Sequence, residues 1–336
     1  MEDIIFSPEL TVPDTVVLHN LADDIRRHRE TNTRAKTNHD EGYSSNGSAV
    51  QKPDVETPAI SASLTALNDP KSPDFEPSVI SSLDFGELRS RLPTALYEYV
   101  VVPYVTWARS IVRHETDVIM LTHLILYFIT SLPSAFWLYY HFTYLHGVMH
   151  FVMQFWYMGT YMLMMHQRIH MNGILAKKPV LQLKGPESDA AKAAFWELSN
   201  YTALYTLSCL SSRATAFVFL CPLLLLRIGL MVDNWGQHAF VDADESDSYF
   251  RSSITLIDVP SNHYCYNDGY HTSNHLNPRR HWRHHPVSFL QQKEVYAAEK
   301  ALVFHNIDYL MITVKLLKRT TFTWRNVWCR LVTRLT

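Results

Sequence analysis

Residues 118–155 read VIMLTHLILYFITSLPSAFWLYYHFTYLHGVMHFVMQF, a run with no acidic residue, lysine or arginine. One spanning helix needs only about 20 apolar residues, so this run is long enough for two passes through a membrane. Pro133 lies in its interior, and proline removes a helical hydrogen-bond donor and disfavours helix in the residue before it. The sequence therefore predicts a helical hairpin, with helices over about 116–132 and 134–152.

A second apolar run covers residues 200–232 and is interrupted by polar residues near Ser211. We expect it to form a second hairpin, with helices over about 199–211 and 214–232. The predicted fold class is all-α, an integral membrane bundle of two hairpins with about four transmembrane helices. Two long helices in place of two hairpins are the alternative reading.

Basic residues gather at the ends of the apolar runs that two hairpins would place on one side. They are Arg109, Arg113, Lys177, Lys178, Lys184, Lys192 and Arg227. Because basic residues near spans favour the cytosolic side, we expect both termini and a histidine-rich helical cap there. The first ten residues, MEDIIFSPEL, lack the basic start and apolar core of a secretory signal, which agrees with a cytosolic amino terminus.

Residues 1–90 differ from the rest in charge, because they hold 16 of the 32 acidic residues but only 8 of the 30 basic ones. Their polar clusters show no sustained hydrophobic period, and such segments bury too little apolar surface to offset their ordering entropy. We expect a mostly disordered acidic tail over 1–90, a membrane domain over 91–290 and a basic amphipathic segment over 291–336. The last part suits a helix on an anionic membrane surface or a packed helix with a solvated face.

Histidines recur at a spacing of four residues near the ends of the apolar runs. The pairs are His146 with His150, His166 with His170, and His271 with His275, and Asn234 precedes His238 by the same spacing. Residues i and i+4 share one helix face, so each pair can offer two side chains to one ion. Histidines without such a partner, at positions 114, 123, 263 and 305, favour a structural role.

Segment 151–165 decides whether the first two pairs can meet. As a helix it covers about 22 Å, less than a hydrocarbon core of about 30 Å, so we expect it to lie along the interface. The first two pairs then lie on one side and converge. A single helix over 144–165 would instead place His146 and His166 about 30 Å apart, too far to share a metal centre.

The number of imidazoles exceeds the four ligands of a tetrahedral zinc ion and indicates two metal ions. Nitrogen-rich ligation suits iron, copper, nickel or zinc, and iron has the redox chemistry that activates dioxygen. The four cysteines have no CxxC spacing, which argues against an iron–sulfur cluster or a zinc ribbon. No GxGxxG or P-loop pattern is present, so we expect reducing electrons from a partner protein. We expect no nucleic-acid partner.

The segments HGVMH, HQRIHMNGIL, NWGQH and YHTSNHLNPRRHW, in that order between apolar hairpins, resemble the membrane fatty acid desaturase superfamily, which includes related hydroxylases. The similarity covers about residues 115–290. It implies a helical membrane domain with a cytosolic di-iron centre of two Fe²⁺ ions, which uses O₂ and two electrons to abstract hydrogen from an unactivated C–H bond. It also implies an electron donor, such as a b-type cytochrome or a ferredoxin with its reductase.

Carried over residue by residue, the resemblance implies a set of metal ligands and no catalytic residue beyond them. The set is His146, His150, His166, His170, Asn234, His238, His271, Asn274 and His275.

The chain departs from the family pattern at two positions. Ile169 stands where the second box has a histidine, and Asn274 occupies the middle histidine position of the last box. An amide oxygen is a weaker ligand for ferrous iron than an imidazole. The shifted frame of His281, His284 and His285 reproduces the HxxHH pattern and stays open, although the sequence after His275 favours the first frame.

The predicted function is a membrane-bound di-iron oxidoreductase that desaturates a C–C bond of a fatty acyl or other lipid-like substrate, in the endoplasmic reticulum. A lipid hydroxylase on the same scaffold is the alternative among enzymes, because the two reactions differ only in the fate of the second hydrogen. The alternative from another class is a non-enzymatic, histidine-rich membrane protein that binds or transports metal.

Overall fold

The computed structural model describes residues 6–7, 10–37, 58–80, 83–166, 186–242, 244–278 and 280–318. The chain divides into two compact units, each described here by itself. The helical unit is Glu76–Gly236, and the histidine unit joins Met1–Phe75 to Gln237–Thr336. These boundaries differ from the ones expected at residues 90 and 290.

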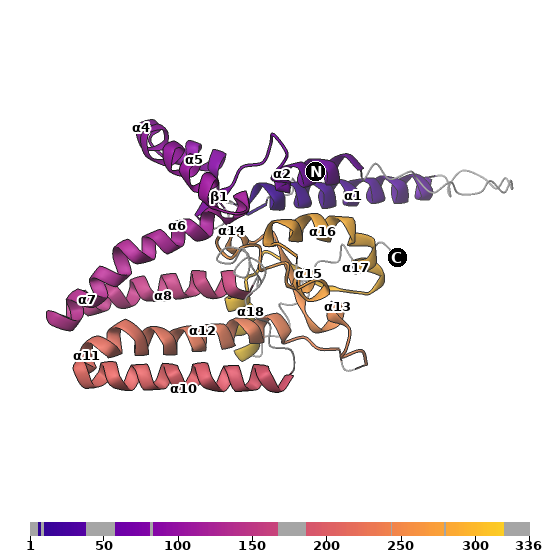
Figure 1. The fold of residues 1–336 in the computed structure, drawn as a ribbon. Coiled ribbons are helices and arrows are strands. Elements are labelled where there is room, and N and C mark those ends of the chain that lie inside the picture. The colour runs from indigo at the N-terminus through magenta and orange to yellow at the C-terminus, as the bar shows by residue number, and fades with distance from the viewer. Residues whose placement is uncertain are drawn as a thin grey trace. The chain divides into compact units, whose positions relative to one another are not determined.

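Long helices make up most of the helical unit (Figure 1). Its elements are β1 (Ser78–Ile80), β2 (Leu83–Asp84), α3 (Phe85–Arg91), α4 (Thr94–Leu96), η1 (Tyr97–Val101), α5 (Val102–Ile111), η2 (Glu115–Asp117), α6 (Val118–Leu126), η3 (Tyr127–Ser131), α7 (Leu132–Tyr140), α8 (Tyr144–His166), α10 (Pro186–Leu210), α11 (Ser212–Thr215), η4 (Ala216–Leu220) and α12 (Cys221–His238), of which α12 ends in the histidine unit. Among the described residues, two helices are long and apolar enough to cross a membrane, Glu115–Tyr140 and Ser212–His238.

The break expected at Pro133 is wrong, because α6, η3 and α7 follow one another without interruption. A π-turn, η3, directly precedes α7, and Pro133 lies in the first turn of α7. Local π adjustments allow a proline inside an apolar helix, since they re-satisfy the backbone groups that proline frees. The chain reverses at residues 141–143 instead, and α8 then continues for 23 residues.

The break expected near Ser211 matches the structure. Helix α10 ends at Leu210, and Ser211 adopts extended backbone angles and accepts a side-chain hydrogen bond from the amide of Ala214. Serine is a favourable helix N-cap because its hydroxyl satisfies an amide that the helix leaves unpaired. Both helices are longer than expected, at 186–210 and 212–238.

Gly147 marks a close approach between α8 and the π-turn η4. A methyl group at this position would lie 3.1 Å from the ring of Phe217 and 3.2 Å from that of Phe142. A side chain larger than hydrogen would push these rings away. The glycine between the histidines of the first pair therefore lets α8 pack closely on its neighbour.

The histidine unit contains a parallel pair of strands with short helices around it. Its elements are α1 (Val12–Thr37), α2 (Pro58–Asn68), α13 (Tyr249–Ser252), β3 (Ile254–Ile257), α14 (Ser261–Tyr264), α15 (His271–Leu276), η5 (Trp282–His284), α16 (His285–Gln291), α17 (Lys293–Ala298), β4 (Leu302–His305) and α18 (Tyr309–Leu317). Strand β3 pairs with β4 in register from Ile254 with Leu302 to Ile257 with His305. All four β3 residues are buried, as is usual for a covered parallel strand.

The amino-terminal segment differs from the disordered tail that we expected. Helix α1 packs Val17, Leu18 and Leu21 into a buried cluster, and α2 adds Leu64 to it. The spacing of the α1 residues places them on one helix face, although the polar composition around them hides this stripe. The basic residues at 325, 330 and 334 lie outside the described residues.

Candidate metal centre

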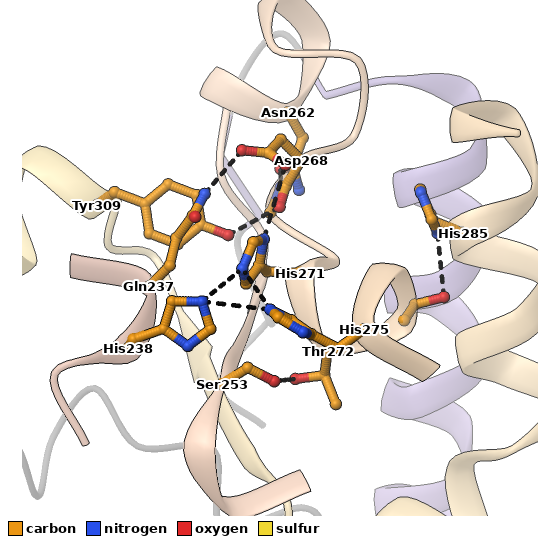
Figure 2. Close-up of polar contacts among 12 residues, drawn as sticks. Gln237, His238, Ser253, Asn262, Asp268, His271, Thr272, His275, His285 and Tyr309 are labelled. Carbon is orange, nitrogen blue, oxygen red and sulfur yellow. Dashed lines mark hydrogen bonds and ion pairs between the residues drawn. The ribbon is translucent and has the colours of Figure 1, made fainter. Parts of the chain in front are cut away.

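Three histidines converge in the histidine unit (Figure 2). The Nε2 atom of His238 lies 3.1 Å from that of His271 and 3.2 Å from that of His275, and the last two are 3.0 Å apart. His271 is buried, and the other two are half-buried. We call these three residues the histidine triad.

Two elements and one carbonyl oxygen position the triad. His271 and His275 lie one turn apart on α15, and His238 ends α12. The Nδ1 atom of His238 lies 2.8 Å from the backbone oxygen of Ser252. A carbonyl oxygen can only accept, so Nδ1 carries the proton and the Nε2 lone pair of His238 faces the two other rings.

The spacing of the three nitrogens fits a metal ion. With a bond of about 2.1 Å, nitrogen ligands at right angles are about 3.0 Å apart, and tetrahedral ligands about 3.4 Å apart. The observed separations, 3.0 to 3.2 Å, fall within this interval. Three imidazoles on one side of an ion leave further positions for substrate or oxygen, which is typical of catalytic rather than structural sites.

A carboxylate supports the triad from behind His271. The Oδ1 atom of Asp268 lies 3.8 Å from Nδ1 of His271, and its Oδ2 atom accepts a hydrogen bond of 2.7 Å from Gln237. Tyr309 donates to the backbone oxygen of Asp268 over 2.8 Å. Such outer carboxylates fix the tautomer of a ligand histidine and make it a better donor to the metal.

Gly269 makes the turn before the triad helix possible. A methyl group here would lie 2.0 Å from Oδ1 of Asn262, which instead accepts a hydrogen bond of 3.1 Å from the amide of Gly269. Asn262 also donates to the backbone oxygen of Leu256 in β3. The sequence reasoning missed Asp268 and Gly269, although the stretch Asp-Gly-Tyr-His places both shortly before a predicted ligand histidine.

The other side of α15 is held by buried polar groups. Ser253 donates to Thr272 over 3.1 Å, next to the carbonyl that fixes His238. Ser273 accepts a hydrogen bond of 2.6 Å from Arg280 and lies 3.1 Å from Nδ1 of His285. Burial, with the Arg280 charge adding to it, lowers the pKa of His285 to about 3, so its ring is neutral near pH 7.

The shifted frame of histidines does not converge. His281 accepts a hydrogen bond of 3.2 Å from the amide of Arg283 and caps η5, and its ring centroid is 6.0 Å from that of His284. His285 turns to Ser273 instead. His271 and His275, from the first frame, are the pair that meets His238.

The two asparagines of the expected ligand set lie beside the triad in sequence. Asn274 is half-buried on α15, and its backbone N–H donates to the backbone oxygen of Tyr270. Asn234 is exposed, one helical turn before His238 on α12. The converging group of acidic, cysteine and histidine side chains is His238, His271 and His275, and the two asparagines stay predicted ligands.

His146 and His150 form a different arrangement in the helical unit. The Oγ atom of Ser134 lies 2.7 Å from Nε2 of His146 and 2.7 Å from Nδ1 of His150. Nε2 of His150 lies 2.9 Å from the side-chain nitrogen of Gln154. A hydroxyl therefore links the two imidazoles, and we call this group the bridged pair.

The expected meeting of the first two pairs is contradicted by the helix that carries them. Helix α8 is continuous from Tyr144 to His166, so His146 and His166 are about 30 Å apart along its axis. The apolar segment between them extends the helix instead of turning along an interface. The side chain of His166 and the whole of His170 lie outside the described residues.

Comparison with protein-family models, with curated proteins and with solved structures found no match to this chain. The resemblance to the desaturase superfamily therefore rests on the histidine boxes alone.

Proposed function

We propose that this chain is an iron-dependent membrane oxidoreductase that uses O₂ and two electrons to desaturate a fatty acyl or other lipid-like chain. The observation that carries the proposal is the convergence of His238, His271 and His275 at metal-ligand spacing. Iron, when bound, supplies the redox chemistry that dioxygen activation requires. The electrons come from a partner such as a b-type cytochrome or a ferredoxin with its reductase.

The residues of the chain have separate tasks in this proposal. The triad holds one ion, and the second ion that the resemblance implies needs imidazoles beyond these three. The carboxylate charge of Asp268, 3.8 Å from Nδ1 of His271, favours a proton on that nitrogen, which leaves Nε2 to face the ion. Substrate positioning would be the main contribution of the apolar helices, because one C–H bond must be held at the oxidising centre.

The outer surface of the helical unit supports a membrane location. Large apolar side chains along α10 are mostly exposed, among them Phe195, Trp196, Leu198, Tyr205 and Leu210. Soluble monomers rarely expose such continuous apolar surface, whereas lipid covers it in a membrane protein. We propose four spanning helices, with both termini and the triad on the cytosolic side of the endoplasmic reticulum membrane.

The test is expression in a host that supplies the b-type cytochrome and its reductase, with mass spectrometry of total lipids and iron analysis of the purified protein. Wild type should give a new unsaturated product and carry iron, and His275→Ala should lose both. His114→Ala, which removes an exposed histidine, is the matched control and should keep both. A hydroxylated product would favour the hydroxylase. Bound iron without any new product would favour a metal-binding protein, and absence of both would overturn the proposal.

A further inference from the structure

The helical segment 94–111 has one apolar face that packs against the rest of the helical unit. Helices α4, η1 and α5 follow one another without a break through this segment (Figure 1). Tyr97, Val105 and Ala108 are buried in a cluster with Val79 and Val118. This inner face accounts for the position of the segment beside the start of α6.

A second apolar face of the same segment is exposed. Leu96, Val100, Trp107 and Ile111 are 44%, 55%, 48% and 54% exposed, and Tyr99 is 83% exposed. The first four are spaced four, seven and four residues apart, so they form one stripe along a helix. A stripe of aliphatic and aromatic side chains is costly in water and indicates a surface that something covers.

We propose that segment 94–111 lies in the plane of the membrane surface, with this stripe inserted at the boundary between lipid headgroups and acyl chains. The inference rests on the proposed membrane location of the chain. It adds an anchoring surface, and its partner is a glycerophospholipid bilayer.

Contacts to the following helix set the depth of the segment. Tyr104 and Thr122 share a hydrogen bond of 2.6 Å, and Arg109 lies 3.2 Å from Glu115. Thr122 lies near the beginning of Glu115–Tyr140, one of the two helices apolar enough to span. The beginning of a span lies at the membrane surface, so a segment fixed to its first turns lies there as well.

The composition of the stripe fits that depth. Tryptophan and tyrosine favour the membrane interface, because one part of each ring system is apolar and the other can hydrogen-bond to water or headgroups. Arg109 in the last turn and Arg113, two residues after the segment, can reach anionic lipid phosphates. Glu98, Thr106 and Ser110 are also exposed and would face water. A second protein would need no such order of apolar, aromatic and basic groups around one helix.

The test places nitroxide labels on the full chain, with Cys209, Cys221, Cys265 and Cys329 replaced by serine, in phosphatidylcholine vesicles with some anionic lipid. Labels at Val100→Cys and Thr106→Cys report contact with oxygen, which concentrates in lipid, and with a water-soluble nickel chelate. We expect the oxygen-to-nickel ratio to be several-fold higher at position 100 than at position 106.

Two results would overturn the inference. A label at position 100 as open to nickel as one at position 106 would place the stripe in water. An immobile label at position 100 that neither reagent reaches would mean that protein covers the stripe. A third label, at Phe128→Cys in the candidate span, separates this failure from that of the membrane location. If position 128 contacts lipid and position 100 does not, only the anchoring surface is wrong.

Discussion

Two histidine pairs in this chain have the same spacing but different surroundings. His271 and His275 meet a third imidazole, His238, at separations of 3.0 to 3.2 Å. His146 and His150 meet the hydroxyl of Ser134 instead. Spacing of four residues therefore provides two imidazoles on one helix face, and a group from another element decides whether they can hold a metal ion.

The numbers of hydrogen-bond donors and acceptors explain why the two arrangements differ. A serine hydroxyl can donate one hydrogen bond and accept another, so Ser134 can satisfy two neutral imidazoles together. In the triad, the carbonyl of Ser252 fixes the proton of His238 on Nδ1 and leaves Nε2 as an acceptor. The three Nε2 atoms of the triad are therefore stabilised less by hydrogen bonds to one another than they would be by a shared cation.

The largest expected effect is a loss of bound metal when a triad histidine is replaced, with no loss when a histidine of the bridged pair is replaced. His275→Ala removes one of three converging ligands, so bound metal should fall to background. His146→Ala should leave the triad ion in place, because its ring already has a hydroxyl partner. Metal analysis of dialysed, detergent-purified protein measures both. Metal lost from His146→Ala and kept by His275→Ala would reverse the comparison.

A second prediction concerns a buried hydrogen bond beside the triad, which joins α15 to α1. Tyr270, which precedes His271 of the triad, donates to Asp14 on α1. Burial raises the pKa of Asp14 from 3.8 to about 6, although its hydrogen bonds oppose the shift. The folded pKa is above the unfolded one, so the stability that this group contributes is full below pH 3.8 and is lost as the pH rises through about 6.

The free energy of unfolding that Asp14 contributes falls by about 3 kcal/mol on going to neutral pH. Buried histidines such as His285 shift in the opposite direction but act equally in both proteins. The free energy of unfolding of Asp14→Asn minus that of wild type should therefore increase between pH 4 and pH 7, because the asparagine takes no charge and keeps an acceptor for Tyr270. Denaturant unfolding followed by tryptophan fluorescence measures it. Asp23→Asn, which changes an exposed pair with Arg26 on the same helix, should follow wild type. The same pH profile in Asp14→Asn and wild type would contradict the prediction.

Part of this organisation could be predicted from the sequence, and the reasons for the rest are physical. The spacing of four residues predicted that His271 and His275 share one helix face, because helical periodicity is a local property. Asp268 lies only three residues before His271, but Gln237 and Tyr309, which hold it, come from elements far apart in the chain, and no local pattern carries those contacts. The apolar stripe of α1 was hidden by polar composition.

Pro133 shows a different limit of sequence reasoning. Proline usually ends a helix, and only the π-turn before α7 reveals that the apolar helix continues through it. The chain reverses at residues 141–143, and α8 follows as one long helix. The length of α8, a separate observation, keeps the first two histidine pairs apart.

A third prediction sharpens the role of the outer carboxylate. Asp268→Ala should weaken metal binding about 10- to 100-fold, because His271 loses the group that orients its ring. Competition between the protein and a chelator for Co²⁺ measures the change, and the Co²⁺ absorption bands report ligand geometry. Asp258→Asn is the control, since Asp258 holds the amide of Ser7 in the same unit. Equal weakening in both variants would mean that Asp268 acts only through folding.

The smallest expected effect tests the bridged pair directly. Ser134→Ala removes the shared hydroxyl, and hydrogen bonds between helices in apolar surroundings contribute on average about 0.6 kcal/mol each. Unfolding in detergent should therefore require slightly less denaturant, while metal content stays at the wild-type level. Thr130→Val, which removes a hydroxyl bonded to Tyr157 on the same pair of helices, is the matched control and should cost a similar amount. If Ser134→Ala raised the metal content, the freed imidazoles would be ligands that the serine had masked, and the two pairs would differ only in what occupies them.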